Sequence, residues 1–302
     1  DASVAAVTAG KAVSLSPQDA GVLCEAALLL GKSGATHHAE QLYRQAMAVA
    51  PDNALPASQL GMMFVEGGGR HSEAQMLLQT ALRIVPSDPT ILARYADLLR
   101  GALQDYDEAD EYYAKALEES PYNSEIVTRY ALMLGVDMLR NESSPARIMV
   151  LQRRSGELFQ RAVLLRPSYS AFQYNLAAHY ERVQHDYDKA RDHYKLAVEC
   201  EEPHPEAYFR LGYVLQYHIR DYAEAEACYQ ACLRSQPLHV TAMCSYGLLL
   251  CNSLKRYRSA RRVLGRVLEL SPSDPDAALG LKFVALLERA AQAEAGGDAL
   301  SD

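Results

Sequence analysis

The sequence predicts an all-α solenoid of stacked helix pairs, and three regularities lead to this fold class. Prolines recur along the chain at intervals of 34 to 36 residues, with a single interval of 46. Most of these prolines follow the pattern Ala-x3-aromatic or Leu-x2-small, whose spacing places its members on one face of a helix. A large residue followed by a small one comes after most of them and indicates another helix. Proline closes each unit because it cannot continue a helix.

The pattern before the prolines recurs seven times and defines the second helix of each pair. Its members are Ala39/Tyr43/Ala46, Ala74/Leu78/Ala81, Ala109/Tyr113/Ala116, Ser155/Phe159/Ala162, Ala190/Tyr194/Ala197, Ala225/Tyr229/Cys232 and Ala260/Leu264/Val267. A regular aromatic at helical spacing usually marks a core face, so we interpret these tyrosines as packing residues rather than as a cofactor site. Small residues let helix backbones approach closely, and stacking of neighbouring units then buries the apolar faces.

We expect one array over residues 1–290, followed by a frayed tail at 293–302. The helix pairs are predicted at about 18–51, 52–86, 87–121, 122–167, 168–202, 203–237 and 238–272, with a terminal helix at 273–292. The interval of 46 residues falls in the fourth pair, where Ser144-Pro145 is typical of a helix start. This predicts a longer second helix from about 145 to 165. Such an insertion either contributes to binding or is a tolerated extension, and both readings stay open.

Composition narrows the classes of function. The chain has 302 residues, 49% of them hydrophobic, and a formal net charge of -8. An acidic chain is a poor general binder of nucleic acid, because neutralising phosphates requires clustered Lys and Arg. No apolar run approaches the roughly 18 residues of a membrane span, so no membrane insertion is expected. The six cysteines form no CxxC pair and mostly fall in apolar helical patterns, which favours a reducing, intracellular compartment, with the cytoplasm as the best fit.

No motif in the sequence indicates catalysis. The GKS at 31–33 lacks the glycine that a phosphate-binding loop needs at position 26, which is Ala26. Cys228 and Cys232 lie four apart on a helix, and His37-His38 has no ligand set at metal spacing, so we interpret these residues as structural. The sequence therefore predicts a protein that is not an enzyme and has no cofactor, no metal and no small-molecule substrate.

The period and the occupied positions resemble the tetratricopeptide repeat family over about 290 residues. The resemblance implies a right-handed α-solenoid of about seven helix hairpins with end helices. The chain departs from the family in having no Trp; the position that the family fills with Trp holds Leu23, Leu92, Val127 and Tyr208. The resemblance also implies that the first helices line a concave groove, through their second, fifth, sixth, ninth, twelfth and thirteenth positions.

Carried over position by position, the resemblance gives a set of partner-binding candidates. They are Leu28, Met62, Arg94, Asp97, Arg129, Leu132, Tyr174, Asn175, Ala178, Phe209, Arg210, Tyr213 and Leu248. The secondary candidates lie in the insertion and on a basic segment near the end, and they are Met138, Ile148, Leu151, Arg258, Arg261 and Arg262. Tyr, Met and Arg are common at protein interfaces, so the groove suits a helix or peptide that is apolar and carries acidic residues.

Two known groove types of the family are missing from these positions. The Lys and Asn pairs that clamp a C-terminal carboxylate in chaperone-binding members are absent, and so is the Asn ladder that holds an extended peptide backbone. The function predicted is therefore a protein-binding scaffold or adaptor within a larger intracellular assembly, with self-association left open. One alternative is an RNA-associated helical-repeat factor, although the acidic charge argues against nucleic acid. Another is the interaction domain of a larger multidomain protein.

Overall fold

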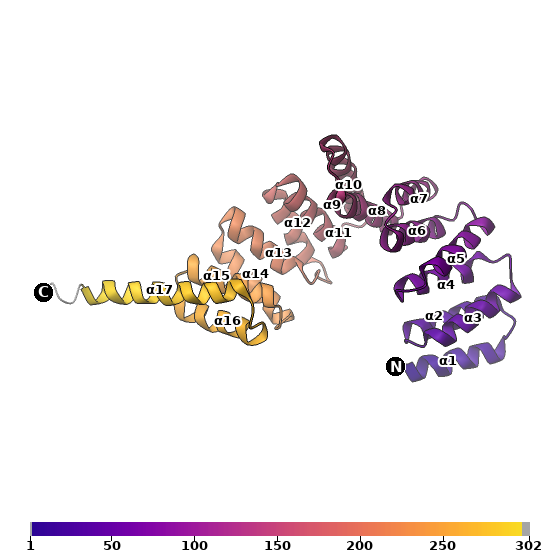
Figure 1. Cartoon of the computed structure of the whole chain (residues 1–302), viewed down its shortest axis with the longest axis horizontal. Helices are drawn as coiled ribbons and strands as arrows, with labels where there is room; N and C mark the ends of the chain where they lie inside the picture. Colours follow the sequence, from indigo (N-terminus) through magenta and orange to yellow (C-terminus); the bar gives the residue numbers. More distant parts are fainter. Residues whose placement is uncertain (1, 298–302) are drawn as a thin grey trace. The chain divides into compact units, whose positions relative to one another are not determined.

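The computed structural model describes residues 2–297, and these residues form helices and turns without a β-strand (Figure 1). The chain divides into two compact units, Asp1–Arg161 and Ala162–Asp302. Within each unit, consecutive helices pack against one another in the order of the sequence, as an α-solenoid requires. The prediction of one continuous array over both units stays a prediction.

The first unit contains ten helices, with two short π-helical segments among them. Their bounds are α1 (Ala2–Leu15), α2 (Ala20–Lys32), α3 (Thr36–Val49), α4 (Ala54–Glu66), α5 (His71–Ile84), α6 (Pro89–Leu98), η1 (Leu99–Leu103), α7 (Tyr106–Glu119), α8 (Ser124–Leu132), η2 (Met133–Met138), α9 (Leu139–Asn141) and most of α10 (Pro145–Leu165). The pairs α2 with α3, α4 with α5, and α6 with α7 pack most extensively.

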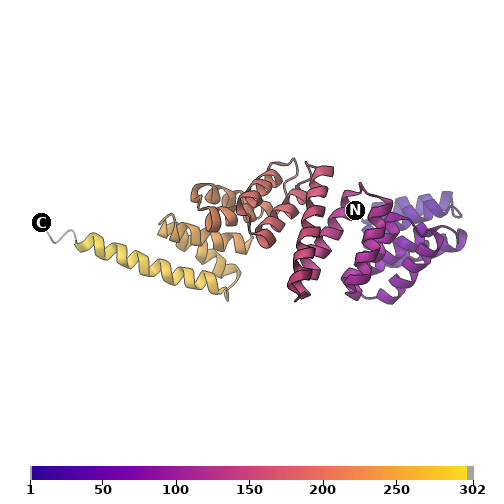
Figure 2. The ribbon, with the colours of Figure 1, turned by 90° about the horizontal axis from the view of Figure 1, so that it is seen from above.

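The second unit contains the end of α10 and the helices that follow it. Their bounds are α11 (Ser170–His179), η3 (Tyr180–Gln184), α12 (Tyr187–Glu199), α13 (Ala207–Val214), η4 (Leu215–Ile219), α14 (Tyr222–Ser235), α15 (Val240–Asn252), α16 (Tyr257–Leu270) and α17 (Pro275–Gly297). Helix α17 is one long unbroken helix that continues past position 292, where the terminal helix was expected to end (Figure 2). Residues 298–302 of the expected tail lie outside the described residues.

Side-chain caps start many of the first helices. The Asp88 carboxylate accepts hydrogen bonds from the backbone N–H groups of Thr90 and Ile91, at 2.8 and 3.0 Å. Asp19, Asn53 and Asn123 do the same at the start of α2, α4 and α8. Each cap satisfies backbone donors that the helix itself leaves free.

A π-helical segment follows the first helix in four of the described pairs, and in three of them it leads into the same tight turn. In the first of them, Gln104 takes a left-handed conformation (φ 56°) and the N–H of Asp105 bonds to the Leu99 carbonyl at 3.0 Å. The Asp105 side chain then caps α7 through the N–H of Glu108. The same turn recurs at His185-Asp186 and Arg220-Asp221. An Asp-Tyr pair therefore marks the start of the second helix in each of these three pairs.

The core of each pair combines a large residue on the second helix with a small one on the first. Tyr43, Tyr113, Tyr194 and Tyr229 are at most 2% exposed, which confirms their prediction as packing residues. A Cβ placed on Gly212 would lie 3.0 Å from the Tyr229 ring, so the small residue on α13 makes room for the tyrosine on α14.

A pair of glycine substitutions tests this close packing. A Cβ on Gly247 in α15 would lie 2.6 Å from Leu264, whereas a Cβ on Gly265 in α16 would meet nothing within 4 Å. We expect Gly247→Ala to lower the free energy of unfolding by about 1–3 kcal/mol through overpacking. Gly265→Ala should raise it by up to about 1 kcal/mol, because alanine is the better helix former. Urea denaturation followed by circular dichroism measures both changes, and equal effects would contradict the proposed packing.

The inserted residues form the long second helix that the sequence predicts. Helix α10 runs from Pro145 to Leu165, which confirms the expected bounds. Its inner stripe includes Leu151, which is 3% exposed and lies in the core of the first unit with Leu158 packed nearby. Met138 is buried in the same core at 8% exposure. Both residues are secondary contact candidates whose side chains face the protein interior. Leu151 does so because the apolar stripe of α10 is its packing face, and Met138 does so at the end of η2.

Candidate functional site

Two predicted groove residues of the first unit form a bridge between neighbouring repeats. Arg129 on α8 donates to the Asp97 carboxylate on α6 at 2.9 Å, and Glu125 pairs with the same guanidinium at 3.2 Å. Asp97 also accepts a short hydrogen bond from the hydroxyl of Tyr113. The charges of Arg129 and Asp97 are therefore largely occupied with each other.

The second unit repeats this arrangement with different residues. Arg210 on α13 lies 3.4 Å from the carboxylate of Glu181, whose side chain is 8% exposed. The Tyr194 hydroxyl donates to the other oxygen of that carboxylate at 2.5 Å. Burial of the guanidinium acts to lower the pKa of Arg210, but Glu181 together with Tyr194 and Tyr174 outweighs it, and the pKa is raised. Arg210 thus also joins repeats within the array.

Arg94 on α6 differs from both of these arginines. It occupies the position of Arg129 and Arg210 in its own repeat, but its guanidinium donates to the Ser58 hydroxyl on α4, at 2.7 Å. Within the part of the chain that the structure describes, Arg94 forms no ion pair. Burial lowers the pKa of Arg94. A half-buried guanidinium without a carboxylate partner is a strong potential binder of an anionic group.

A pocket of about 310 Å³ lies beside Arg94. Its walls come from α4, α6 and the turns before them, and they include Leu55, Ser58, Thr90, Ile91 and Arg94. Asp52 and Asp88 also line it, but the Asp88 carboxylate is engaged in capping α6. The pocket therefore combines an apolar wall with the Arg94 guanidinium and two carboxylates, at a place where repeats adjoin.

The other predicted groove residues differ in how far they reach solvent. Leu28 is 40% exposed, whereas Phe209 is only 7% exposed and packs near Tyr229 and His239. The remaining ones are half-buried, namely Met62, Leu132, Tyr174, Asn175, Ala178, Tyr213 and Leu248. Tyr174 stacks on His204 with ring centroids 3.9 Å apart, so it also serves the packing of the second unit.

The secondary candidates outside the core lie on α10 and α16. Ile148 is half-buried, whereas Arg258, Arg261 and Arg262 are exposed on α16. Two further arginines of the basic segment are in ion pairs, Arg256 with Glu226 at 2.8 Å and Arg266 with Glu269 at 2.6 Å. The segment is therefore an exposed but partly neutralised face.

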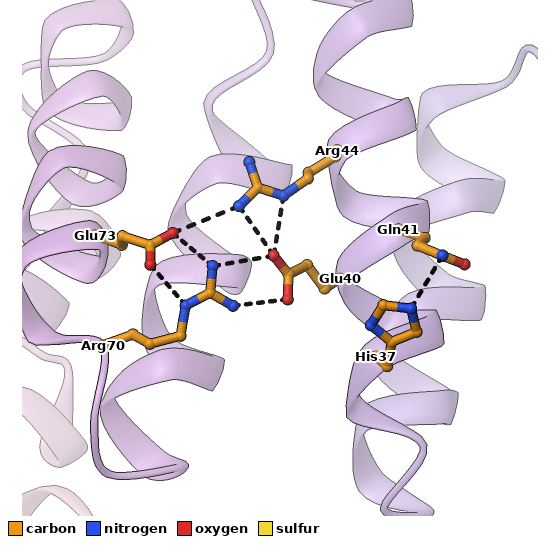
Figure 3. A network of polar contacts seen from close by, with 6 residues as sticks. All are labelled: His37, Glu40, Gln41, Arg44, Arg70 and Glu73. Carbon is orange, nitrogen blue, oxygen red and sulfur yellow. Dashed lines mark hydrogen bonds and ion pairs between the residues drawn. The ribbon is translucent and has the colours of Figure 1, made fainter.

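One polar network was not anticipated from the sequence. Arg70, in the turn before α5, pairs with Glu40 on α3 at 2.7 Å and with Glu73 on α5 at 2.5 Å, and Arg44 joins both carboxylates (Figure 3). The Arg70 guanidinium also lies 3.9 Å from the centroid of the Phe64 ring. Glu40 and Arg70 are 30 residues apart, close to one repeat period, which is the only sequence signal for this contact.

The sequence comparisons find the repeat in two places. Models of the tetratricopeptide repeat match residues 66–124 and 205–237. A protein adenylyltransferase Fic of Drosophila ananassae is 40% identical over 57 residues, which is 19% of this chain and 12% of that protein. No described helix is both long and apolar enough to cross a membrane.

Solved structures share the fold at low sequence identity. The human IFIT1 dimer with PPP-AAAA superposes with a TM-score of 0.68 and 19% identity, covering 95% of this chain and 69% of that chain. TTC0263, a thermophilic TPR protein in Thermus thermophilus, gives a TM-score of 0.51 and 21% identity, covering 66% of this chain and all of that one. The seven-fold sequence pattern, the helix pairs that it forms and the two matching family models together identify this chain as a tetratricopeptide repeat protein.

Proposed function

We propose that this chain is a non-enzymatic scaffold or adaptor that binds a partner protein through the first unit, with an acidic side chain of the partner placed at Arg94. Tetratricopeptide repeats in general suggest a role in protein interaction. The observation that carries the proposal is the contrast among three equivalent arginines. Arg129 and Arg210 each pair directly with a carboxylate of the neighbouring repeat. The Arg94 guanidinium instead donates to the Ser58 hydroxyl, and the Asp88 carboxylate acts on it without an ion pair between them in the described residues.

The partner segment would be apolar around its acidic residue. Leu55 and Ile91 line the pocket beside the guanidinium, so an aliphatic or aromatic side chain next to the carboxylate would be buried with it. A desolvated charge-assisted hydrogen bond supplies both specificity and affinity in such a place. The proposal assigns the chain to an intracellular assembly and gives it no catalytic step and no cofactor.

A selection of peptides displayed on phage tests the proposal on the full chain. We expect the wild type to enrich peptides with an acidic residue flanked by apolar ones. The Arg94→Gln variant should bind the enriched peptides roughly tenfold to a hundredfold more weakly, because the charge-assisted hydrogen bond is lost. Arg83→Gln, at an exposed arginine of α5, is the matched control and should bind like the wild type.

Two results would contradict this function. Enriched peptides without acidic residues, or equal binding by Arg94→Gln, would exclude a role of Arg94 in binding a carboxylate. The IFIT1 structure contains PPP-AAAA, so a 5′-triphosphate oligoadenylate is the second probe. Submicromolar binding of this oligonucleotide, with no peptide enriched, would favour the RNA-associated alternative.

A further inference from the structure

An exposed apolar stripe runs along α17 in the second unit. Leu279, Phe283 and Leu286 are 67%, 47% and 62% exposed. Their spacing of four and three residues places them on one face of the helix. The opposite face is packed, because Ala277 and Val284 are fully buried and a Cβ on Gly280 would lie 2.9 Å from Leu264 of α16. Helix α17 is thus covered on one side and apolar on the other.

The equivalent positions elsewhere in the second unit are buried. Two repeat periods earlier, Leu279 and Leu286 correspond to Phe209 and Gln216 of the sixth repeat, which are 7% and 6% exposed. The second helix of that repeat, α14, packs on this face: the Tyr229 hydroxyl donates to the Gln216 side chain at 2.7 Å, and the Tyr229 ring centroid lies 6.4 Å from that of Phe209. In the residues that the structure describes, no second helix covers the same face of α17. The stripe on α17 therefore corresponds to a face that the second helix covers in the sixth repeat.

Charge limits what kind of helix would fit there. Lys282 and Arg289 are both exposed and lie seven residues apart, nearly two helical turns, so they follow the same edge of the stripe. A helix with acidic residues along its adjoining edge would meet these two cations. A helix with basic residues there would be repelled.

We propose that the stripe of Leu279, Phe283 and Leu286 binds an amphipathic helix of a partner protein that carries acidic residues along one edge. The partner helix takes the place of a repeat's second helix. Its apolar face presents small residues around one large residue, as Ala225, Tyr229 and Cys232 do in α14. This surface belongs to the second unit and does not depend on the proposed role of Arg94 in the first.

Two peptides from the chain itself are suitable probes. Residues 104–121 hold the acidic second helix α7, with its Ala109, Tyr113 and Ala116 face. Residues 256–271 hold α16, which has the same kind of apolar face but five arginines and a single acidic residue. Each is labelled with fluorescein and titrated with the full chain by fluorescence anisotropy. Isolated helices of this length are marginal in water, so we expect a Kd of roughly 10–100 µM for the acidic peptide and at least tenfold weaker binding of the basic one.

Variants locate the binding and test the charge. Leu279→Glu/Leu286→Glu should abolish binding of the acidic peptide. Leu238→Glu changes a leucine outside the stripe that is also 67% exposed, and it should leave binding unchanged. Lys282→Glu/Arg289→Glu should weaken the acidic peptide roughly tenfold and strengthen the basic one. Thermal melts followed by circular dichroism check that each variant keeps its helices; the charge variants alter only exposed side chains and so test the proposal even if the leucine variants unfold.

Three outcomes would overturn the inference. The first is no saturable binding of the acidic peptide, and the second is binding that survives the leucine changes in a folded variant. The third is wild-type self-association, measured by sedimentation velocity, that the leucine changes abolish, because a second copy would then be the occupant of the stripe.

Discussion

Replacing Tyr194 by alanine is expected to lower the free energy of unfolding of the second unit by about 4 kcal/mol. Tyr194 is fully buried, so the substitution leaves a cavity between α11, α12 and the helix that follows. It also removes the hydroxyl that donates to Glu181 at 2.5 Å, which leaves a buried carboxylate with one bonding partner fewer. Because repeats depend on their neighbours, the loss should spread to the adjoining helix pairs.

The contribution of the hydroxyl can be separated from that of the ring. Tyr194→Phe keeps the packing volume and should cost only about 1–2 kcal/mol, mainly from the unsatisfied carboxylate. Urea denaturation of both variants gives the two values, and hydrogen exchange shows whether protection is lost first in α11 to α13. A cost for Tyr194→Phe as large as that for Tyr194→Ala would mean that the polar contact, rather than the packing, dominates.

The second large effect is a loss of stability in acid that originates in His179. This side chain is 4% exposed, and burial lowers its pKa from 6.5 to about 4. The unfolded chain binds a proton here below about pH 6.5, whereas the folded chain does not until about pH 4. Protonation therefore favours the unfolded state across that window, and stability falls as the pH is lowered. The difference of the two pKa values corresponds to about 3 kcal/mol.

Other histidines of the second unit act in the same direction. Burial also lowers the pKa of His193, which bonds to Gln173, and of His204, which stacks on Tyr174. We expect the urea concentration at the midpoint of unfolding to decrease as the pH is lowered from 7 to 4.5. His179→Leu should make this dependence on pH shallower. His185→Gln, at an exposed histidine, is the control and should leave the slope unchanged. A slope that His179→Leu does not alter would exclude His179 as its main source.

The helices and their core faces could be predicted from the sequence alone, because the packing residues of each repeat recur at helical spacing within that repeat. The positions of Tyr113, Tyr229 and Leu264 are set by a helical period that local chemistry imposes, and the partners of these residues lie in the same or the next repeat. The long helix α10 could be predicted for the same reason: Ser144-Pro145 starts it and an apolar stripe continues it. Such local signals do not depend on the rest of the fold.

Contacts between repeats were decided only by the tertiary structure. The sequence places Arg94, Arg129 and Arg210 at equivalent positions, yet it does not tell which of them meets a carboxylate, because that depends on the side chain that the preceding repeat presents. Met138 and Leu151 are contact candidates in the sequence, yet both are buried in the core, because an apolar residue of the insertion suits a partner and the neighbouring helices equally well. The exposure of Leu279 was equally hidden, since its pattern is that of a buried position and only the absence of a covering helix among the described residues distinguishes it. The sequence by itself thus determined the helices and their core faces, through local periodicity. Only the tertiary structure decided which charged and apolar groups stay available to a partner, because each such group is covered or paired by side chains from a neighbouring helix.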